Sequence, residues 1–563
     1  MLPNRPRPGG GRVIDRDIHL ARALLVEGNP LMRSVAAGQL RNIGVGHVAQ
    51  VSRIKDARML IEREAFDIII CNREFEDCAD SGQDLLDELR REHQLPHSTV
   101  FLMVTSQASY HQVVEAAESA LDGILVRPYT GALLSQRLIE ARHRKRELGD
   151  ILLALDNGQT EIALTRALKR FQDKQPYATY CGRLVAELLL DMGRPQDALT
   201  LFEKLAQPSG AIWARLGVAR SLMAKGDTAT ARKAILAVLN DEPREADAHD
   251  LLGRTLVEQC DFDGALAAYR EAATLTPGCL LRNQHAGALA FYQGQGKESL
   301  KLLERALGLG AQSKLFDALT LLLIAVLRHD MGDKAGVASM REHLMRYRER
   351  FPQSRRLDRF CQAADVLAAL AAGSSDPALG MLRQLSAQAG DDNFDLEAAN
   401  SVLMLWARVP PGERPPLEHE ALVERIGMRF CTSKAITEVL VASAQRADPA
   451  LAIVRGCQAR VASLAERAMD HSLKGEVEAA VQLLLETGSL ALNAKLLEMT
   501  VLIARRHRGQ VAQADAWADT ASQLLARSCR PDSHIAGIQR SGRSPGGLQL
   551  RLRAPSQAEV AAV

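Results

Sequence analysis

The chain has 563 residues, of which 47% are hydrophobic and only 4% are aromatic. Its 70 basic and 68 acidic residues leave a formal charge of +2, which argues against the strongly basic surface of nucleic-acid-binding proteins. A composition poor in aromatic residues favours stacked helices over a β-sandwich. The length suits three or four domains, or one domain followed by an extended array.

Nine cysteines are scattered along the chain without a CxxC pair, so the sequence indicates neither a zinc site nor a disulfide framework. This usage is typical of proteins in a reducing cytosol. The longest apolar run, around residues 318–327, is about half of the roughly 18–20 residues that a membrane span requires. The first residues, MLPNRPRPGGGR, lack the apolar stretch of a signal peptide. We therefore expect a cytoplasmic protein with no membrane segment.

Residues 1–19 form a basic arm containing Gly and Pro, which we expect to be disordered. From residue 20 to residue 148, short apolar runs alternate with amphipathic stretches. The apolar runs predict strands at 21–27, 47–52, 66–72, 99–105 and 122–128, and the amphipathic stretches predict helices at 30–44, 53–65, 81–92, 109–120 and 130–148. Strict alternation indicates βαβ units. Residues 20–148 are therefore predicted to form a doubly wound α/β domain with a five-stranded parallel sheet.

Beyond residue 149 no strand pattern remains, and a helical repeat takes over. Turn signals recur about every 34 residues, which is the period of a helix–turn–helix solenoid. They lie at Asn157-Gly158, Met192-Gly193, Lys225-Gly226, Gln259-Cys260, Gln293-Gly294 and Met331-Gly332. In most units Gly ends the first helix. We expect an all-α solenoid over 149–350, a degenerate helical continuation over 351–527 and a disordered tail over 528–563.

The helix predicted at 130–148 connects the two regions. It contains no Pro, and the only Gly within its continuation is Gly149. We therefore predict that it leads directly, or with one bend at Gly149, into the first helical hairpin. Helices shared in this way hold two domains in a nearly fixed orientation, whereas a Gly/Ser linker does not. The basic segment RHRKR at 142–146 is predicted to be a solvated helix face, with contact to acidic partners as the alternative.

Four segments of the first region carry a family likeness: LLVEGNPLMR, FDIIICN, FLMVTSQAS and DGILVRPY. Through them, residues 20–148 resemble the response-regulator receiver family, the phospho-accepting domains of two-component signalling. The resemblance implies a flavodoxin-like fold. It also implies a pocket with an acidic pair that holds Mg²⁺, an Asp that accepts the phosphoryl group, a Ser or Thr, and a Lys. A hard cation prefers carboxylate oxygens, and the Lys pairs with the phosphoryl group.

Placed on this family pattern, the chain departs from it at most positions. The acidic pair corresponds to Glu27 and Gly28, the acceptor to Asn72, and the Lys to Arg127, whereas Thr105 fits. An amide cannot form an acyl phosphate, and one carboxylate leaves too few hard ligands for Mg²⁺. We therefore predict a degenerate phosphorylation pocket, a pseudo-receiver, that takes no metal or other cofactor.

Alternative interpretations of these positions remain open. Asp77 and Asp80 in the following loop are substitute metal ligands in principle, although a solvated acidic loop is the favoured interpretation. Glu27 and Arg127 are expected to converge at the carboxyl edge of the sheet, where a salt bridge between them would fill the empty pocket. Thr105 is either a structural hydroxyl or a remnant of a switch.

The second region resembles the tetratricopeptide repeat family, most clearly in residues 246–277. There Leu252-Gly253, Ala265, Tyr269 and Pro277 stand at the characteristic positions of the family. The resemblance implies a concave groove, lined by the first helix of each hairpin, that binds peptides or partner helices. The candidate groove residues are Tyr180, Arg183, Glu187, Trp213, Arg220, Asp250, Arg254, Gln284 and Phe291. For each of them, packing between hairpins is the competing interpretation.

The chain contains none of the common nucleotide-binding or hydrolase motifs. His93 and His97 have the spacing of two ligands on one helix face, but Pro96 argues against a continuous helix and hence against a metal site. We therefore predict a non-enzymatic adaptor of two-component phosphorelay signalling, which binds protein partners through the groove and the receiver surface. The alternative is a functional response regulator that is phosphorylated by non-standard chemistry. The sequence leaves the oligomeric state open.

Overall fold

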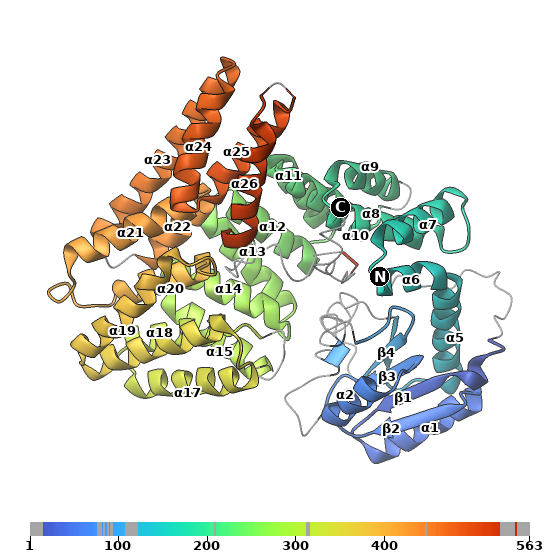
Figure 1. The fold of residues 1–563 in the computed structure, drawn as a ribbon. Coiled ribbons are helices and arrows are strands. Elements are labelled where there is room, and N and C mark those ends of the chain that lie inside the picture. Colours follow the sequence, from blue (N-terminus) through green and yellow to red (C-terminus); the bar gives the residue numbers. More distant parts are fainter. Residues whose placement is uncertain are drawn as a thin grey trace.

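The computed structural model describes most of the chain (Figure 1). The described residues are 15–75, 82, 85, 86, 89, 94–106, 122–207, 210–310, 316–444, 448–509, 511–529, 547 and 548. The predicted helix at 109–120, most of the one at 81–92, and Asp77, Asp80 and His93 lie outside them.

The first region forms the predicted α/β domain. Its strands are β1 (Arg22–Val26), β2 (His47–Val51), β3 (Ile68–Asn72), β4 (Val100–Thr105) and β5 (Gly123–Val126), and its described helices are η1 (Ile18–Leu20), α1 (Pro30–Ile43), α2 (Ile54–Arg63) and α5 (Gly131–Glu147). The five strands are parallel and have the order β2-β1-β3-β4-β5. This topology confirms the expected doubly wound sheet.

The sheet separates two apolar layers because successive side chains of a strand point to opposite faces. In β1, Ala23 and Leu25 belong to the layer that α1 and α5 cover, whereas Leu24 and Val26 belong to the layer that α2 covers. The buried strands β3 and β4 alternate in the same way. The near-continuous apolar runs in the sequence follow from this double burial.

The N-terminal arm is more ordered at its end than the sequence suggested. Asp15 accepts hydrogen bonds from Arg142 Nε at 2.6 Å and from Arg146 Nη1 at 2.8 Å, and Ile18 is buried. The expectation of disorder up to residue 19 was therefore wrong for residues 15–19. The solvated basic face expected at 142–146 was wrong for the same reason, because Arg144 also pairs with Asp122 at 2.7 Å.

After residue 148 every described element is a helix. The first hairpins are α6 (Gly149–Asp156) with α7 (Thr160–Gln172), α8 (Ala178–Asp191) with α9 (Pro195–Ala206), α10 (Ile212–Ala224) with α11 (Thr228–Asp241), α12 (Ala246–Glu258) with α13 (Phe262–Leu275), α14 (Leu280–Tyr292) with α15 (Gly296–Gly310), and α16 (Leu319–Asp330) with α17 (Lys334–Arg350). All six predicted turns separate the helices of these pairs. Five of them contain a glycine with φ between 70° and 84°, and Cys260 adopts the same left-handed conformation with φ 61°.

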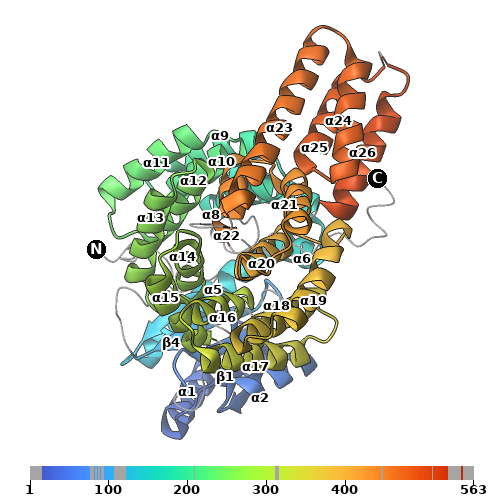
Figure 2. The same cartoon turned by 90° about the vertical axis from the view of Figure 1, so that its left-hand side faces the viewer.

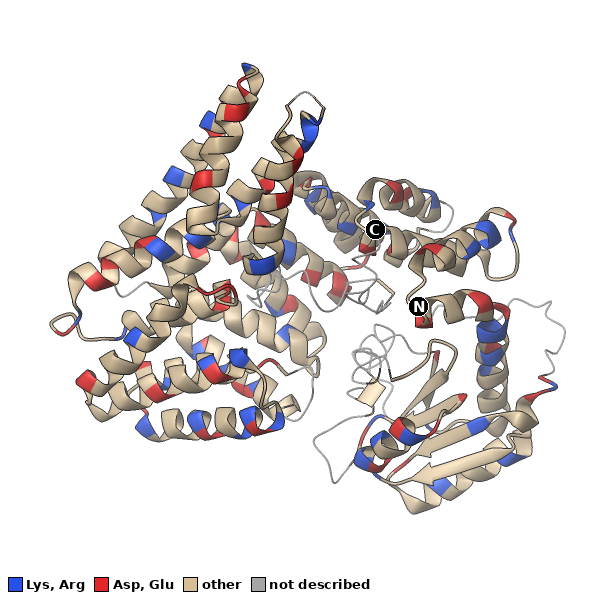
Figure 3. Ribbon diagram, in the orientation of Figure 1, with Lys and Arg blue, Asp and Glu red and all other residues tan. Residues whose placement is uncertain are grey.

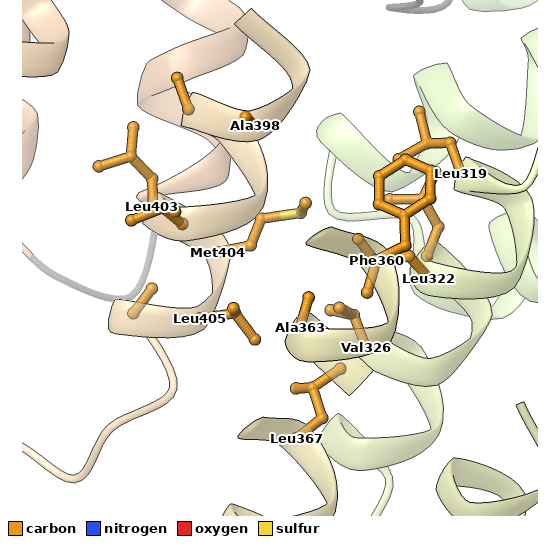
Figure 4. Close-up of a cluster of buried hydrophobic side chains, with 14 of the residues drawn as sticks. Leu319, Leu322, Val326, Phe360, Ala363, Leu367, Ala398, Leu403, Met404 and Leu405 are labelled. Carbon is orange, nitrogen blue, oxygen red and sulfur yellow. The ribbon is translucent and has the colours of Figure 1, made fainter. Parts of the chain in front are cut away.

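The helices continue beyond residue 350 without a change of architecture. They are α18 (Arg355–Ala372), α19 (Ser375–Ala387), η2 (Gln388–Gly390), α20 (Leu396–Trp406), α21 (Pro416–Phe430), α22 (Lys434–Ser443), α23 (Asp448–Leu473), α24 (Val477–Ala491), α25 (Ala494–Arg506) and α26 (Ala514–Ser528). Side chains of α16, α18 and α20, among them Val326, Phe360 and Met404, share one buried cluster (Figure 4). The helical core therefore crosses the proposed boundary at residue 350.

The array is curved, and α8, α10, α12 and α14 lie on its inner side (Figure 2). The partner helices α9, α11, α13 and α15 lie outside them, while α23 to α26 project away from the curve. Helix α22 packs against α14, so the later helices return to the earlier ones. None of the described helices is both long enough and apolar enough to cross a membrane.

The α/β domain and the array are joined as predicted, with one bend. Helix α5 ends at Glu147 and α6 begins at Gly149, so only Leu148 separates them. Asp156 at the end of α6 accepts hydrogen bonds from the backbone N–H of His97, at 3.0 Å, and from its Nδ1, at 2.5 Å. The guanidinium of Arg144 lies 5.7 Å from the ring centroid of Tyr180 on α8. These contacts tie the first hairpins to the α/β domain.

Protease resistance tests this junction. In limited trypsin digestion of the native protein, we expect cleavage outside residues 142–158 first, because the basic residues there are paired and helical. Asp156→Ala removes the acceptor for His97 and should accelerate cleavage within this segment. Asp173→Ala, at an exposed position after α7, is the matched control. Rapid cutting of the wild type within 142–158 would refute a fixed junction.

A glycine in several first helices allows close contact with a bulky side chain. A Cβ at Gly217 would lie 2.3 Å from Cδ1 of the buried Phe202, and one at Gly253 would lie 2.8 Å from Cε1 of Tyr269. Side chains at these positions would collide with rings that have no space to move, because protein interiors are close-packed.

We expect Gly217→Ala to destabilise the protein by about 1–3 kcal/mol, the usual cost of overpacking a core. Gly308 lies exposed within α15, where an added Cβ would meet no atom within 4 Å. Gly308→Ala should therefore leave stability unchanged or raise it by up to about 1 kcal/mol. The midpoint of helix loss in urea, followed by circular dichroism, measures both effects. Equal midpoints for the two variants would contradict the close packing.

Candidate functional site

The carboxyl edge of the sheet gathers the residues that the sequence singled out in the receiver region. Glu27 follows β1, Asn72 ends β3, Thr105 ends β4, and Arg127 follows β5. Since these strands are parallel neighbours, their ends meet at one edge. Glu27, Asn72 and Thr105 are at least nine-tenths buried. The fold therefore assembles these four positions into one pocket.

Glu27 and Arg127 form an ion pair between Oε2 and Nη2 in this pocket. The second carboxylate oxygen, Oε1, accepts hydrogen bonds from the backbone N–H of Asn29, at 3.0 Å, and from Nδ2 of Asn72, at 3.5 Å. The carboxylate is thus neutralised and hydrogen-bonded by the chain itself. The sequence left open how Glu27 and Arg127 are used, and the structure contains the salt bridge between them.

Glu74 completes the pocket, and sequence reasoning missed it. Its Oε1 accepts a hydrogen bond from the hydroxyl of Thr105 at 2.9 Å, and its Oε2 accepts one from the hydroxyl of Ser106 at 3.3 Å. Its backbone carbonyl accepts a hydrogen bond from Nδ2 of Asn72 at 2.7 Å. The carboxylate of Glu74 therefore lies at the hydroxyl that an incoming anion would need. The signal in the sequence that could have identified Glu74 is its place two residues after Asn72, the acceptor position.

The described residues of this pocket provide few of the ligands that a divalent cation requires. Glu27 is its only carboxylate from the expected ligand pair, and Arg127 already neutralises it. At Gly28 an added Cβ would lie 3.6 Å from Phe75 and 3.8 Å from the carbonyl of Ser52, so packing permits a side chain there. Burial, followed by the charge of Glu27, raises the pKa of the neighbouring Cys71 thiol and keeps it neutral. Across the described ranges, His, Cys, Asp and Glu side chains form no metal-binding group of three or more.

The candidate groove residues lie on the inner helices of the array, but several bond to neighbouring hairpins. Glu187 on α8 and Arg220 on α10 form a buried bidentate ion pair at 2.6 and 2.8 Å. Gln284 on α14 donates to the hydroxyl of Thr320 at 2.9 Å, and Phe291 packs against the large core cluster. At these positions the structure has the packing between hairpins that was the competing interpretation, and their role as groove residues stays a prediction. Their side chains are used in stacking the hairpins, which a repeat pattern cannot distinguish from ligand contact.

The other five candidates are half-buried on the same helices: Tyr180, Arg183, Trp213, Asp250 and Arg254. The guanidinium of Arg183 lies 4.7 Å from the ring centroid of Trp213, a cation–π contact between α8 and α10. Asp250 on α12 accepts a hydrogen bond from Arg282 on α14 at 2.7 Å. Tyr180 and Trp213 both pack against the apolar cluster of the first hairpins. This end of the inner face therefore presents aromatic surface beside paired charges.

Comparison with known families supports the resemblance of the α/β domain and that of the helical array. Residues 23–139 match the family described as response regulator receiver domain, and residues 189–255 match the family described as tetratricopeptide repeat. The chain therefore contains a receiver domain, of the class that acts in two-component signalling, together with tetratricopeptide repeats, which mediate protein–protein interaction. Domains of both classes are generally non-catalytic.

The receiver domain has curated relatives. Chemotaxis protein CheY-3 of Vibrio cholerae is 28% identical over 117 residues, covering 21% of this chain and 88% of that protein. Chemotaxis protein CheY of Pseudomonas aeruginosa is 28% identical over 117 residues, covering 21% of this chain and 92% of that protein.

Two solved repeat structures align with the chain at low similarity. A tetratricopeptide repeat protein from Parabacteroides merdae covers 49% of this chain and 99% of its own, with 11% identity and a TM-score of 0.34. The C-terminal part of a TPR repeat-containing protein from Cytophaga hutchinsonii covers 52% and 99%, with 13% identity and a TM-score of 0.29.

The buried ion pair of the pocket should contribute to the stability of the receiver domain. Glu27→Gln leaves the Arg127 guanidinium without its counter-charge, and we expect a loss of about 1–3 kcal/mol. Glu64 pairs with Arg22 where both side chains are more than 40% exposed, so Glu64→Gln should cost at most about 1 kcal/mol. Hydrogen exchange of the β1 and β3 amides measures both losses. Equal losses of stability in Glu27→Gln and Glu64→Gln would contradict a larger contribution from the buried ion pair.

Proposed function

We propose that this protein is a non-catalytic adaptor of bacterial-type two-component, or phosphorelay, signalling whose receiver domain does not accept a phosphoryl group. The observation that carries the proposal is Asn72 at the end of β3. Its amide donates hydrogen bonds to the Glu74 carbonyl and to Glu27. A carboxylate oxygen at this position would attack a phosphoryl donor, whereas a neutral amide is not a competent nucleophile.

The charges around Asn72 support the same proposal. Arg127 is engaged by Glu27, so its guanidinium is already paired where an active receiver pairs a cation with the phosphoryl group. The carboxylate of Glu74 holds the Thr105 hydroxyl. An incoming phosphoryl group would have to displace this carboxylate to reach the Thr105 hydroxyl. The phosphoryl group and the carboxylate are both negatively charged, so they would repel each other at hydrogen-bonding distance. The pocket is thus held in one state by the chain's own side chains.

The array supplies the proposed adaptor function. We propose a receiver domain over 20–148, a repeat array over 149–350, a degenerate continuation over 351–527 and terminal segments outside these bounds. Asp156 binds His97 just before β4, at the opposite end of that strand from Thr105. A protein bound near the pocket edge would therefore leave the first hairpins accessible to a second protein. A cytoplasmic location belongs to the proposal, since the described cysteines are free.

Phosphorylation with a small-molecule donor tests the proposal. With acetyl phosphate and Mg²⁺ at pH 7, we expect the intact mass of the wild-type protein to remain unchanged. The matched control is the triple variant Gly28→Asp, Asn72→Asp and Arg127→Lys, which supplies the expected carboxylates and Lys in a position where Gly28 has room. This control should gain a base-labile phosphate, which shows that the donor is competent. A base-labile phosphate on residues 20–148 of the wild type would refute the pseudo-receiver and favour a regulator with non-standard chemistry.

A further inference from the structure

A basic surface lies where α17 turns into α18. Residues 346–357, here called the arginine turn, contain five arginines and a single acidic residue, Glu349, whereas the whole chain has a formal charge of only +2. They comprise the end of α17, the connecting turn and the start of α18. Helix α17 lies at the edge of the array, and basic residues recur along it (Figures 1 and 3). The arginine turn therefore concentrates positive charge at an outer edge of the molecule.

One of the five arginines is used in packing the array. Arg356 donates hydrogen bonds to Glu397 at 2.6 Å and to Asp317 at 2.5 Å, and so connects α18 to α20 and to the loop before α16. The other four arginines are exposed: Arg346, Arg348, Arg350 and Arg355. The positive charge that faces solvent therefore comes from residues that the core of the array does not use.

Local structure accounts for only part of this charge. Arg346 pairs with Glu342, and Arg348 Nε lies 2.5 Å from Asp358 Oδ1, but all four side chains are exposed by a third or more, where ion pairs contribute little. Arg355 is the first residue of α18, where the helix macrodipole disfavours a cation. Its side chain forms no hydrogen bond or ion pair with any residue that the structure describes. Helix stability therefore does not explain Arg355, and weak surface pairs leave Arg346 and Arg348 able to exchange partners.

Aromatic side chains lie beside these charges. The guanidinium carbon of Arg350 is 5.6 Å from the ring centroid of Tyr347 and 5.8 Å from that of Phe351, and the two rings are 5.4 Å apart. Phe351 is 37% exposed, and it is the only exposed residue among the Phe, Tyr and Trp residues that the structure describes. Arginine and aromatic residues are enriched among the side chains that dominate binding energy at protein interfaces. The arginine turn has this composition.

The acidic residues of α17 indicate which kind of partner fits. A guanidinium binds carboxylates and phosphates alike, so the arginines alone admit an acidic protein or a nucleic acid. Glu342 and Glu349 are exposed among the arginines of α17. The evenly spaced phosphates of a nucleic acid would come close to these carboxylates, whereas a peptide can place its own carboxylates at the arginines only. The near-neutral charge of the chain also disfavours a nucleic acid.

We propose that the arginine turn is a protein-binding surface of the array, separate from the inner helices α8, α10, α12 and α14. Its partner is a protein with an acidic segment that carries an aromatic or aliphatic side chain among its Asp and Glu residues. The carboxylates pair with Arg346 and Arg355, and the apolar side chain covers Phe351. This proposal rests on the proposed use of the array for protein binding, but not on the state of the receiver pocket. Binding through exposed charges is sensitive to salt.

The test uses the full chain and a fluorescein-labelled peptide, EDEFEDE, with fluorescence anisotropy as the measurement. The wild type should bind this peptide in 50 mM salt and bind it several-fold more weakly in 300 mM salt, because salt screens exposed charges. The double variant Arg346→Glu, Arg355→Glu should lose affinity by at least about tenfold in 50 mM salt. Phe351→Ser should lose about threefold or more at both salt concentrations, because an apolar contact is not screened.

A matched control keeps the net charge the same. Arg383 on α19 and Arg460 on α23 are 51% and 62% exposed, and each pairs with a glutamate as Arg346 does. The double variant Arg383→Glu, Arg460→Glu should therefore bind the peptide like the wild type. Circular dichroism checks that every variant retains its helices. The uncharged peptide QNQFQNQ should bind the wild type at least about tenfold more weakly than EDEFEDE.

Four outcomes would overturn the proposal. The first is no binding of EDEFEDE to the wild type in 50 mM salt, and the second is equal binding of the acidic and uncharged peptides. The third is an equal loss of affinity in the two double variants, which would assign the binding to net charge alone. The fourth is tighter binding of a 20-nucleotide oligothymidylate that Arg346→Glu, Arg355→Glu abolishes, which would assign the surface to nucleic acid. Because no phosphoryl donor is used, this surface and the pseudo-receiver can fail independently.

Discussion

Buried polar contacts between successive first helices set the geometry on which the array depends. Glu187 on α8 binds Arg220 on α10, and Arg282 on α14 binds Asp247 and Asp250 on α12. Further along, Arg356 on α18 joins Asp317 and Glu397. A buried charge that loses its partner costs several kcal/mol, so each contact permits only one register between neighbouring hairpins. In a stacked repeat, where each unit contacts its neighbours, these registers add up to the overall curve.

The same chemistry has opposite consequences in the two halves of the molecule. In the array, paired charges fix how hairpins stack, and aromatic side chains such as Trp213 pack beside them. In the receiver domain, the pairing of Glu27 with Arg127 and of Glu74 with Thr105 uses the groups that would otherwise bind a cation and an anion. A ligand that used these charged groups would have to replace hydrogen bonds that the chain already makes.

The parts of the fold that depend on local pattern could be predicted from the sequence. Continuous apolar runs marked the doubly covered strands, and the turn glycines, such as Gly226, marked left-handed backbone that the structure contains. Contacts between residues far apart in the sequence could not be predicted. The contact of Glu74 with Thr105, for example, does not follow from a periodicity. Likewise, Glu187 and Arg220 have the spacing of groove residues, and only their mutual distance shows that they bind each other.

The contact between α22 and α14 has a consequence for the synthesis of the chain. An open solenoid can fold hairpin by hairpin as it leaves the ribosome, because each unit needs only its neighbours. Here the surface of α14 is completed by a helix about 140 residues later. At translation rates of about 5–20 residues per second, that surface stays uncovered for roughly 7–28 s. During this interval the nascent array lacks the contact of α14 with α22, which makes it a natural substrate for chaperones that bind unfinished chains.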